Sequence, residues 1–256
     1  STASYGGAVF GEESTTIVFE SSTTIARCEA SSRGGGIFGF DVTVAGEAVV
    51  AECSADHAGG GIFARRSAAL RDRGVVTDCR TLGLGGGLAV TGRGTAVIEH
   101  DARITRCTAL RADWDWGGTG SSGGGVYGSV GVQVVLRHNA TVTQCRSEYG
   151  GGVSAQNITA EGNAMITHCA ARFSGAFFLD SYVDSLVVSV AALKDYATIR
   201  NCSALYGGGI AMDSFTKLTV TDDARITQCA AAGDGGGLAL WRGALALVDG
   251  QAALTH

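Results

Sequence analysis

The chain contains no proline and few aromatic residues, and neither sign of charge dominates it. Phe, Trp and Tyr make up 7% of its 256 residues, and the formal net charge is −5. Because proline is missing, every residue keeps a backbone N–H for strand pairing. Lys and Arg form no basic cluster, which excludes the usual nucleic-acid footprint, so we expect no nucleic-acid partner.

Long apolar runs are also missing. No run reaches the roughly 18 residues that a transmembrane helix needs, so we expect no membrane span. Hydrophobic residues nevertheless make up 45% of the chain, and charged residues only 17%. This composition excludes wholesale disorder and allows the chain to bury a sizeable core.

Glycine and cysteine are abundant, and their positions reveal a repeat. The chain has 40 glycines and 8 cysteines, and each cysteine stands in a similar phrase, Ala-x-(Ile/Val)-x-x-Cys-x-(Ala/Ser/Thr). Five or six residues after most of the cysteines comes a glycine triplet, followed by an aliphatic residue. The cysteines are Cys28, Cys53, Cys79, Cys107, Cys145, Cys169, Cys202 and Cys229. The triplets begin at Gly34, Gly59, Gly85, Gly123, Gly150, Gly207 and Gly235, with an extra copy at Gly6 and a degenerate one at Ser174.

The length of this unit predicts the fold. Most spacings between cysteines lie between 24 and 28 residues, which matches one coil of a parallel β-solenoid. Triple glycines and β-branched residues are poor helix formers, so helical repeats are excluded. We therefore predict an all-β protein, a right-handed single-stranded parallel β-helix of about nine coils, in one continuous domain over residues 1–256.

Within the phrase, the alternation of residue types predicts a strand with one buried face. The Ala five residues before the cysteine and the Ile or Val three before it alternate with other residues. The step from the Ile or Val to the cysteine is three residues rather than two, which predicts a bend that turns the cysteine inward. The residue two after the cysteine is Ala, Ser or Thr, as a narrow interior requires.

The glycine motif resembles that of a known family. Gly6-Gly7-Ala8-Val9 matches the GGA-(Ile/Leu/Val) motif of polymorphic outer membrane proteins as it stands, and the GGG copies are close variants. The second motif of that family, Phe-x-x-Asn, is similar to the cysteine phrase, with Ile or Val in place of Phe and Cys in place of Asn. The resemblance covers essentially the whole chain. It implies a right-handed β-helix in a cell-surface setting.

Two inserted loops interrupt the repeat, near residues 111–122 and 178–195. Insertions in a solenoid become loops on one face, which is frequently the binding face. The first loop carries Trp114 and Trp116, for which two interpretations stand. The rings contact a glycan or a protein partner, or the loop folds back onto the coil.

The eight cysteines should stack in one column, with neighbours about 4.8 Å apart. Either they form a ladder of buried thiols that pack as small hydrophobic groups, or they form disulfides between adjacent coils, which that spacing permits. Any bridges would join consecutive cysteines, because cysteines two coils apart lie beyond bridging distance. Metal binding is not expected, since paired Cys-x-x-Cys motifs are missing. Catalytic use is not expected either, since all eight cysteines occupy equivalent apolar positions that disfavour a thiolate.

Three of the four asparagines stand in N-glycosylation sequons, at Asn139, Asn157 and Asn201. In a eukaryotic secreted protein these residues would carry glycans, and in a bacterial protein the matches would be coincidence. The sequence leaves both interpretations open.

His100 and His138 both lie seven residues before a cysteine, so we expect them to stack on neighbouring coils. Asp72 and Asp195 share this column. A metal or acid–base site is one interpretation of the column. A polar turn is the preferred one, because Ser, Gly and Asp occupy the same position in other coils. We therefore expect no catalytic residue, no metal site and no cofactor.

A chain made almost entirely of repeat indicates a non-enzymatic structural or adhesive module of an extracellular or cell-surface assembly, such as a filament or flagellar hair. Its expected partners are other protein subunits, further coils of the same chain, and glycans. The alternative is a carbohydrate-active β-helix enzyme, a polysaccharide lyase or hydrolase, on fold analogy. Because residues 252–256 begin another cysteine phrase, the sequence also predicts a piece of a longer polypeptide.

Overall fold

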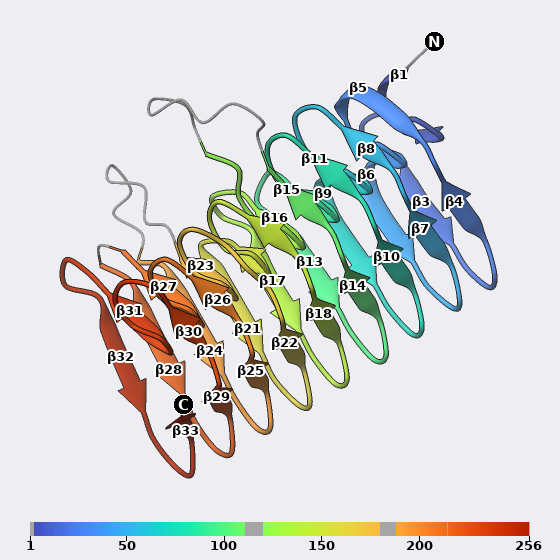
Figure 1. The fold of residues 1–256 in the computed structure, drawn as a ribbon. Coiled ribbons are helices and arrows are strands. Elements are labelled where there is room, and N and C mark those ends of the chain that lie inside the picture. Colours follow the sequence, from blue (N-terminus) through green and yellow to red (C-terminus); the bar gives the residue numbers. More distant parts are fainter. Residues whose placement is uncertain (1–2, 111–119, 180–187, 214, 256) are drawn as a thin grey trace.

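The computed structural model describes residues 3–110, 120–179, 188–213 and 215–255. Over these residues the chain winds into a parallel β-helix, with each coil lying beside the next (Figure 1). One sheet holds nine strands, one from each of nine coils. The prediction of an all-β parallel β-helix of about nine coils is therefore confirmed.

The strands that precede the cysteines form sheet C. They run in parallel, and the first eight each end two residues before a cysteine. Sheet C consists of β4 (Thr24–Ala26), β7 (Val49–Ala51), β10 (Val75–Thr77), β14 (Arg103–Thr105), β18 (Thr141–Thr143), β22 (Met165–Thr167), β25 (Thr198–Arg200), β29 (Arg225–Thr227) and β33 (Ala253–Thr255).

The strands between each glycine triplet and the following turn form sheet B, which has sixteen strands. In the second and third coils this stretch is a single long strand, and in the others it is divided in two. Sheet B consists of β2 (Val9–Phe10), β3 (Thr16–Phe19), β6 (Ile37–Val44), β9 (Ile62–Leu70), β12 (Leu88–Val90), β13 (Thr95–Ile98), β16 (Val126–Gly128), β17 (Gln133–Leu136), β20 (Val153–Ser154), β21 (Asn157–Ala160), β23 (Phe177–Leu179), β24 (Val190–Leu193), β27 (Ile210–Met212), β28 (Lys217–Val220), β31 (Leu238–Leu240) and β32 (Leu245–Val248).

Short strands form the third side of most coils, and all but the first of them follow a cysteine. Sheet A consists of β1 (Ala3–Tyr5), β5 (Glu29–Arg33), β8 (Ser54–Ala55), β11 (Arg80–Thr81), β15 (Thr108–Ala109) and β19 (Arg146–Ser147), and the same side carries the pair β26 (Ser203–Ala204) and β30 (Ala230–Ala231). Over the described residues, no helix has the length and apolar character that a membrane crossing requires.

The pairing register aligns equivalent residues of the repeat from coil to coil. In sheet C, Val76 pairs with Ile104, and Ile104 pairs with Val142. These three side chains are fully buried and belong to one hydrophobic core along the stack. Burying one such side chain stabilises the fold by about 1.5–3 kcal/mol. The hydrophobic core therefore consists of the inward-facing residues that the alternation predicts.

Two columns of left-handed residues turn the chain at the same places in each coil. The residue just before each cysteine has a φ of 52–57°, although none of these residues is glycine. This bend accounts for the three-residue step and turns the cysteines inward, as predicted. The residue seven positions before each cysteine is also left-handed, and it is Ser, Gly, Asp or His. The polar column predicted from the sequence thus lies at a turn.

The glycine triplets lie where neighbouring coils come closest. A Cβ on Gly35, the second glycine of its triplet, would lie 2.2 Å from the carbonyl oxygen of Gly60 in the next coil. The first glycine of a triplet has a left-handed φ, which Ser174 also adopts, at 61°. The degenerate copy Ser174-Gly175-Ala176 thus keeps glycine at the second position, where a Cβ would lie closest to the backbone of the next coil.

Candidate functional site

The cysteine column lies inside the coils, directly after the left-handed bend. All eight cysteines are free thiols in the structure; seven are buried, and Cys28 is half-buried. Each Sγ donates to the carbonyl oxygen two residues earlier, at 3.1–3.4 Å. The cysteines therefore face the interior, as predicted. Both interpretations of the column, a ladder of buried thiols and disulfides between consecutive cysteines in an oxidising compartment, stay predictions.

Burial and thiol–thiol contacts disfavour the charged form of Cys28, Cys53 and Cys229. Burial raises the pKa of Cys28, and a hydrogen bond with Cys79, together with burial, raises the pKa of Cys53. A hydrogen bond with Cys202, together with burial, likewise raises the pKa of Cys229. Because a protonated thiol is a weak nucleophile and a poor metal ligand, these three cysteines are suited to packing rather than to chemistry.

The residues predicted to bear or contact glycans differ in their placement. Asn139 is exposed in a turn, whereas Asn157 begins β21 and is half-buried. Asn201 stands at the left-handed bend before a buried cysteine, with a φ of 52°. Of the three sequons, the one at Asn139 is therefore the most open to a glycan. Trp114 and Trp116 lie outside the described residues, so their contact with a glycan or partner stays a prediction.

The turn column uses its aspartates to bind the backbone of the preceding turn. The carboxylate of Asp72 accepts from the N–H of Gly46 at 3.2 Å, and that of Asp195 accepts from the N–H of Gly162 at 2.8 Å. The carboxylate of Asp222 in turn accepts from the N–H of Asp195 at 3.3 Å. Asp therefore serves this column in two ways, since it tolerates a left-handed φ and joins neighbouring coils.

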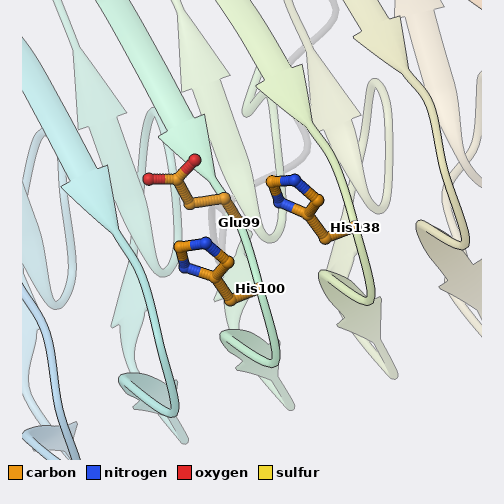
Figure 2. Close-up of side chains that lie close together, drawn as sticks. All are labelled: Glu99, His100 and His138. Carbon is orange, nitrogen blue, oxygen red and sulfur yellow. The ribbon is translucent and has the colours of Figure 1, made fainter.

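Two histidines replace the aspartates in the middle of this column, and Figure 2 shows them with Glu99 on neighbouring coils. The rings of His100 and His138 stack with centroids 4.9 Å apart and planes 10° apart. Their stacking was predicted from the sequence. Glu99 follows β13, and its carboxylate accepts from Nε of Arg137 at 2.7 Å. On the other side of the stack, Nδ1 of His100 lies 3.3 Å from Oδ1 of Asp72.

Sequence reasoning missed a groove of about 930 Å³ on the outside of the coils. The groove is lined by residues that immediately precede the glycine triplets and by residues of the strands that follow the triplets. Aromatic rings, an amide and a few charged groups line it. Lining residues include Arg33, Asp56, Tyr127, Tyr149, Gln156 and Asp213.

A row of stacked rings continues from Tyr149, which lines the groove, toward the last coils. The rings of Tyr149 and Phe173 stack with centroids 5.0 Å apart, and those of Phe173 and Tyr206 with centroids 5.6 Å apart. Trp241 meets Tyr206 edge-on at 6.1 Å. The sequence does carry a signal for this ladder, because Tyr149, Phe173 and Tyr206 each stand immediately before a glycine triplet or its degenerate copy.

Comparison with known proteins yields no relative. No family model matches the chain, and neither does any curated protein or solved structure. The resemblance to polymorphic outer membrane protein repeats therefore depends on the glycine and cysteine motifs. Support for a function comes from the coils, the groove and the turn column.

Proposed function

We propose that the chain is a structural and adhesive module of an extracellular or cell-surface assembly, in which the groove binds an extended glycan. One observation carries the proposal. The groove extends from Arg33 to Asp213, which is six repeat steps of ~4.8 Å, or about 29 Å along the coil axis. A long, open groove lined by aromatic rings fits a linear sugar chain better than a compact ligand.

The coils hold the groove rigidly. Tyr127 lies on β16 and pairs with Ala89 of β12 and Ser154 of β20. Tyr149 forms isolated parallel bridges to Ser122 on one side and to Phe173 on the other. Side chains on paired strands keep their spacing without an ordering cost on binding, so they suit a ligand whose own units repeat.

Affinity electrophoresis through gels that contain soluble polysaccharides, both neutral and acidic, tests this proposal. We expect at least one polysaccharide to retard the chain, and Tyr149→Ala to weaken that binding at least about fivefold through loss of ring contact. Tyr196→Ala is the matched control, because Tyr196 lies at a turn and is 63% exposed. Equal loss in both variants, or no retardation by any polysaccharide, would contradict the proposal.

The competing function is a polysaccharide hydrolase or lyase that uses the same groove. Glycoside hydrolysis needs two carboxyl groups about 5–9.5 Å apart. The two carboxylates that line the groove within the described residues are Asp56 and Asp213. They lie five repeat steps apart, about 24 Å, which favours binding without turnover. Release of reducing or unsaturated sugar ends that Asp56→Asn or Asp213→Asn abolishes would instead support the enzyme.

The surface setting has its own test, because a eukaryotic secreted chain would carry glycans. Peptide mass mapping of the native protein should then find a higher glycan occupancy at the exposed Asn139 than at the half-buried Asn157. Recovery of the native protein inside the cell, with Asn139 unmodified, would contradict this setting.

A further inference from the structure

We propose that His100, His138 and Glu99 bind a divalent transition metal ion of the zinc type on the outer face of the turn column. One ligand atom of each residue lies within 4.8 Å of the others (Figure 2). Both histidines are exposed and Glu99 is half-buried, so an ion reaches them directly from solvent. This inference is independent of the groove and of the proposed glycan binding.

The donor set selects the kind of ion. Two imidazoles and one carboxylate are the ligands of many zinc sites, which leave the fourth position to water. Calcium and magnesium prefer sets made of oxygen. Arg137 binds one carboxylate oxygen of Glu99, Oε2, so the other oxygen is the one offered to the ion.

Supporting contacts orient the ligands. Asp72 lies 3.3 Å from Nδ1 of His100, so its carboxylate accepts the Nδ1 proton and directs Nε2 of that ring toward an ion. Carboxylate–histidine–metal arrangements of this kind are common around zinc and strengthen binding. His100 and His138 adopt nearly the same left-handed φ, 57° and 59°, at equivalent positions of neighbouring turns. The backbone thus presents both rings from equivalent positions.

Binding needs the two rings to move, because their planes are nearly parallel, 10° apart. Ligand atoms on a tetrahedral zinc ion lie about 3.3 Å apart, given zinc–nitrogen bonds of about 2.0–2.1 Å. The stacked rings have centroids 4.9 Å apart, so they must tilt toward each other. The side chain of His100 is 48% exposed, which leaves it free to rotate while the coils stay in place.

The test uses the full chain, titrated with Zn²⁺ against a chromophoric chelator and with Co²⁺ by visible absorption. A Cys28→Ser background removes the half-buried thiol as a rival ligand. We expect one ion per chain, and we expect His100→Ala and His138→Ala each to weaken the affinity at least about tenfold. Asp72→Asn should weaken it about 10–100-fold without removing a ligand.

His168→Ala is the matched control, because His168 is exposed, lies outside the cluster, and has Nε2 3.4 Å from Nδ2 of Asn201. It should change the affinity less than twofold. Circular dichroism confirms that each variant remains folded. Zn²⁺ binding of undiminished strength in a His100→Ala/His138→Ala double variant would overturn the proposal. So would Co²⁺ spectra that show thiolate charge transfer in place of nitrogen and oxygen ligation.

Discussion

At the scale of single residues, the three glycines of a triplet do different things. The first supplies a left-handed turn, and the second lies against the backbone of the next coil. The third faces the interior, where a Cβ on Gly36 would lie 3.2 Å from Sγ of Cys53. Ser174 and Ala176 show that the first and third positions accept a small side chain, and Gly175 retains the second.

Gly35→Ala and Gly36→Ala form a matched pair that tests this difference. A Cβ on Gly35 would meet backbone oxygens at 2.2 and 2.4 Å, whereas the nearest atom to a Cβ on Gly36 lies at 2.9 Å. We expect Gly35→Ala to lower the free energy of unfolding by about 3 kcal/mol or more, and Gly36→Ala by about 1 kcal/mol. Urea denaturation measures both, and equal losses would contradict the assignment.

Thiol reactivity follows burial along the ladder. Cys28 is half-buried and the other seven cysteines are buried. Alkylation of the native protein with iodoacetamide, followed by peptide mapping, should therefore modify Cys28 first, and slowly, because burial raises its pKa. In denaturant all eight thiols should react together. Modification of Cys107 as fast as Cys28 in the native protein would contradict the buried ladder.

At the scale of elements, the bends join neighbouring coils by side chains as well as by backbone. Asp78 and Arg106 occupy the left-handed position of successive coils. Nε of Arg106 donates to Oδ1 of Asp78 at 2.7 Å, and Nη2 donates to Oδ2 at 2.7 Å. The bidentate Arg106 guanidinium and the Thr77 hydroxyl lower the pKa of Asp78. At this point of the bend column, an ion pair between coils therefore adds to the strand pairing.

The pH dependence of this pair has a definite sign. Since the pKa of Asp78 is lowered in the folded state, the pair stabilises the fold at and above the ordinary carboxyl range. That stability is lost as the pH falls through the lowered value. Asp78→Asn should destabilise the chain at pH 7 by no more than about 1 kcal/mol, because both side chains are more than a third exposed.

At pH 3 the difference between Asp78→Asn and the parent should shrink, as measured by urea denaturation at both pH values. Arg106→Met in both backgrounds completes a double-mutant cycle and isolates the pair. A loss of stability as large at pH 3 as at pH 7 would contradict an ionic contribution.

At the scale of the whole molecule, each coil contacts its neighbours alone, so stability is distributed along one axis. Ile104 and Val142, in the middle coils, are fully buried. Toward the ends the inward columns open to solvent: Ile17 is only half-buried, and Leu254, which pairs with the buried Ile226, is 39% exposed. The middle coils therefore have a packed neighbour on both sides, and the outer ones are less covered.

Hydrogen exchange should report this gradient in the 256-residue chain. We expect amide protection to be greatest in β14 and β18 and to fall toward β3 and β32, because coils with one neighbour open at lower free energy. Mass spectrometry of peptides after exchange for seconds to days measures it. Uniform protection along the stack would indicate that all nine coils open as a single unit.

The periodicity of the sequence was sufficient to predict the coil, because every coil repeats the same local pattern. The alternation around Ile104 predicted an inward column, and the three-residue step to Cys107 predicted the bend that the φ of Arg106, 53°, produces. The stacking of His100 on His138 could be predicted too, since parallel pairing in register places equivalent positions one strand spacing apart.

Tertiary structure alone decided which side chains from different positions of the repeat meet. Tyr127 follows a glycine triplet and Tyr149 precedes one, yet both line the same groove. Glu99 meets the two imidazoles because its side chain and theirs leave the turn on one face. Such contacts depend on the directions of the side chains and on how the sides of each coil are arranged around the axis of the stack. A one-dimensional period determines what repeats along the stack, but not which columns lie side by side around it.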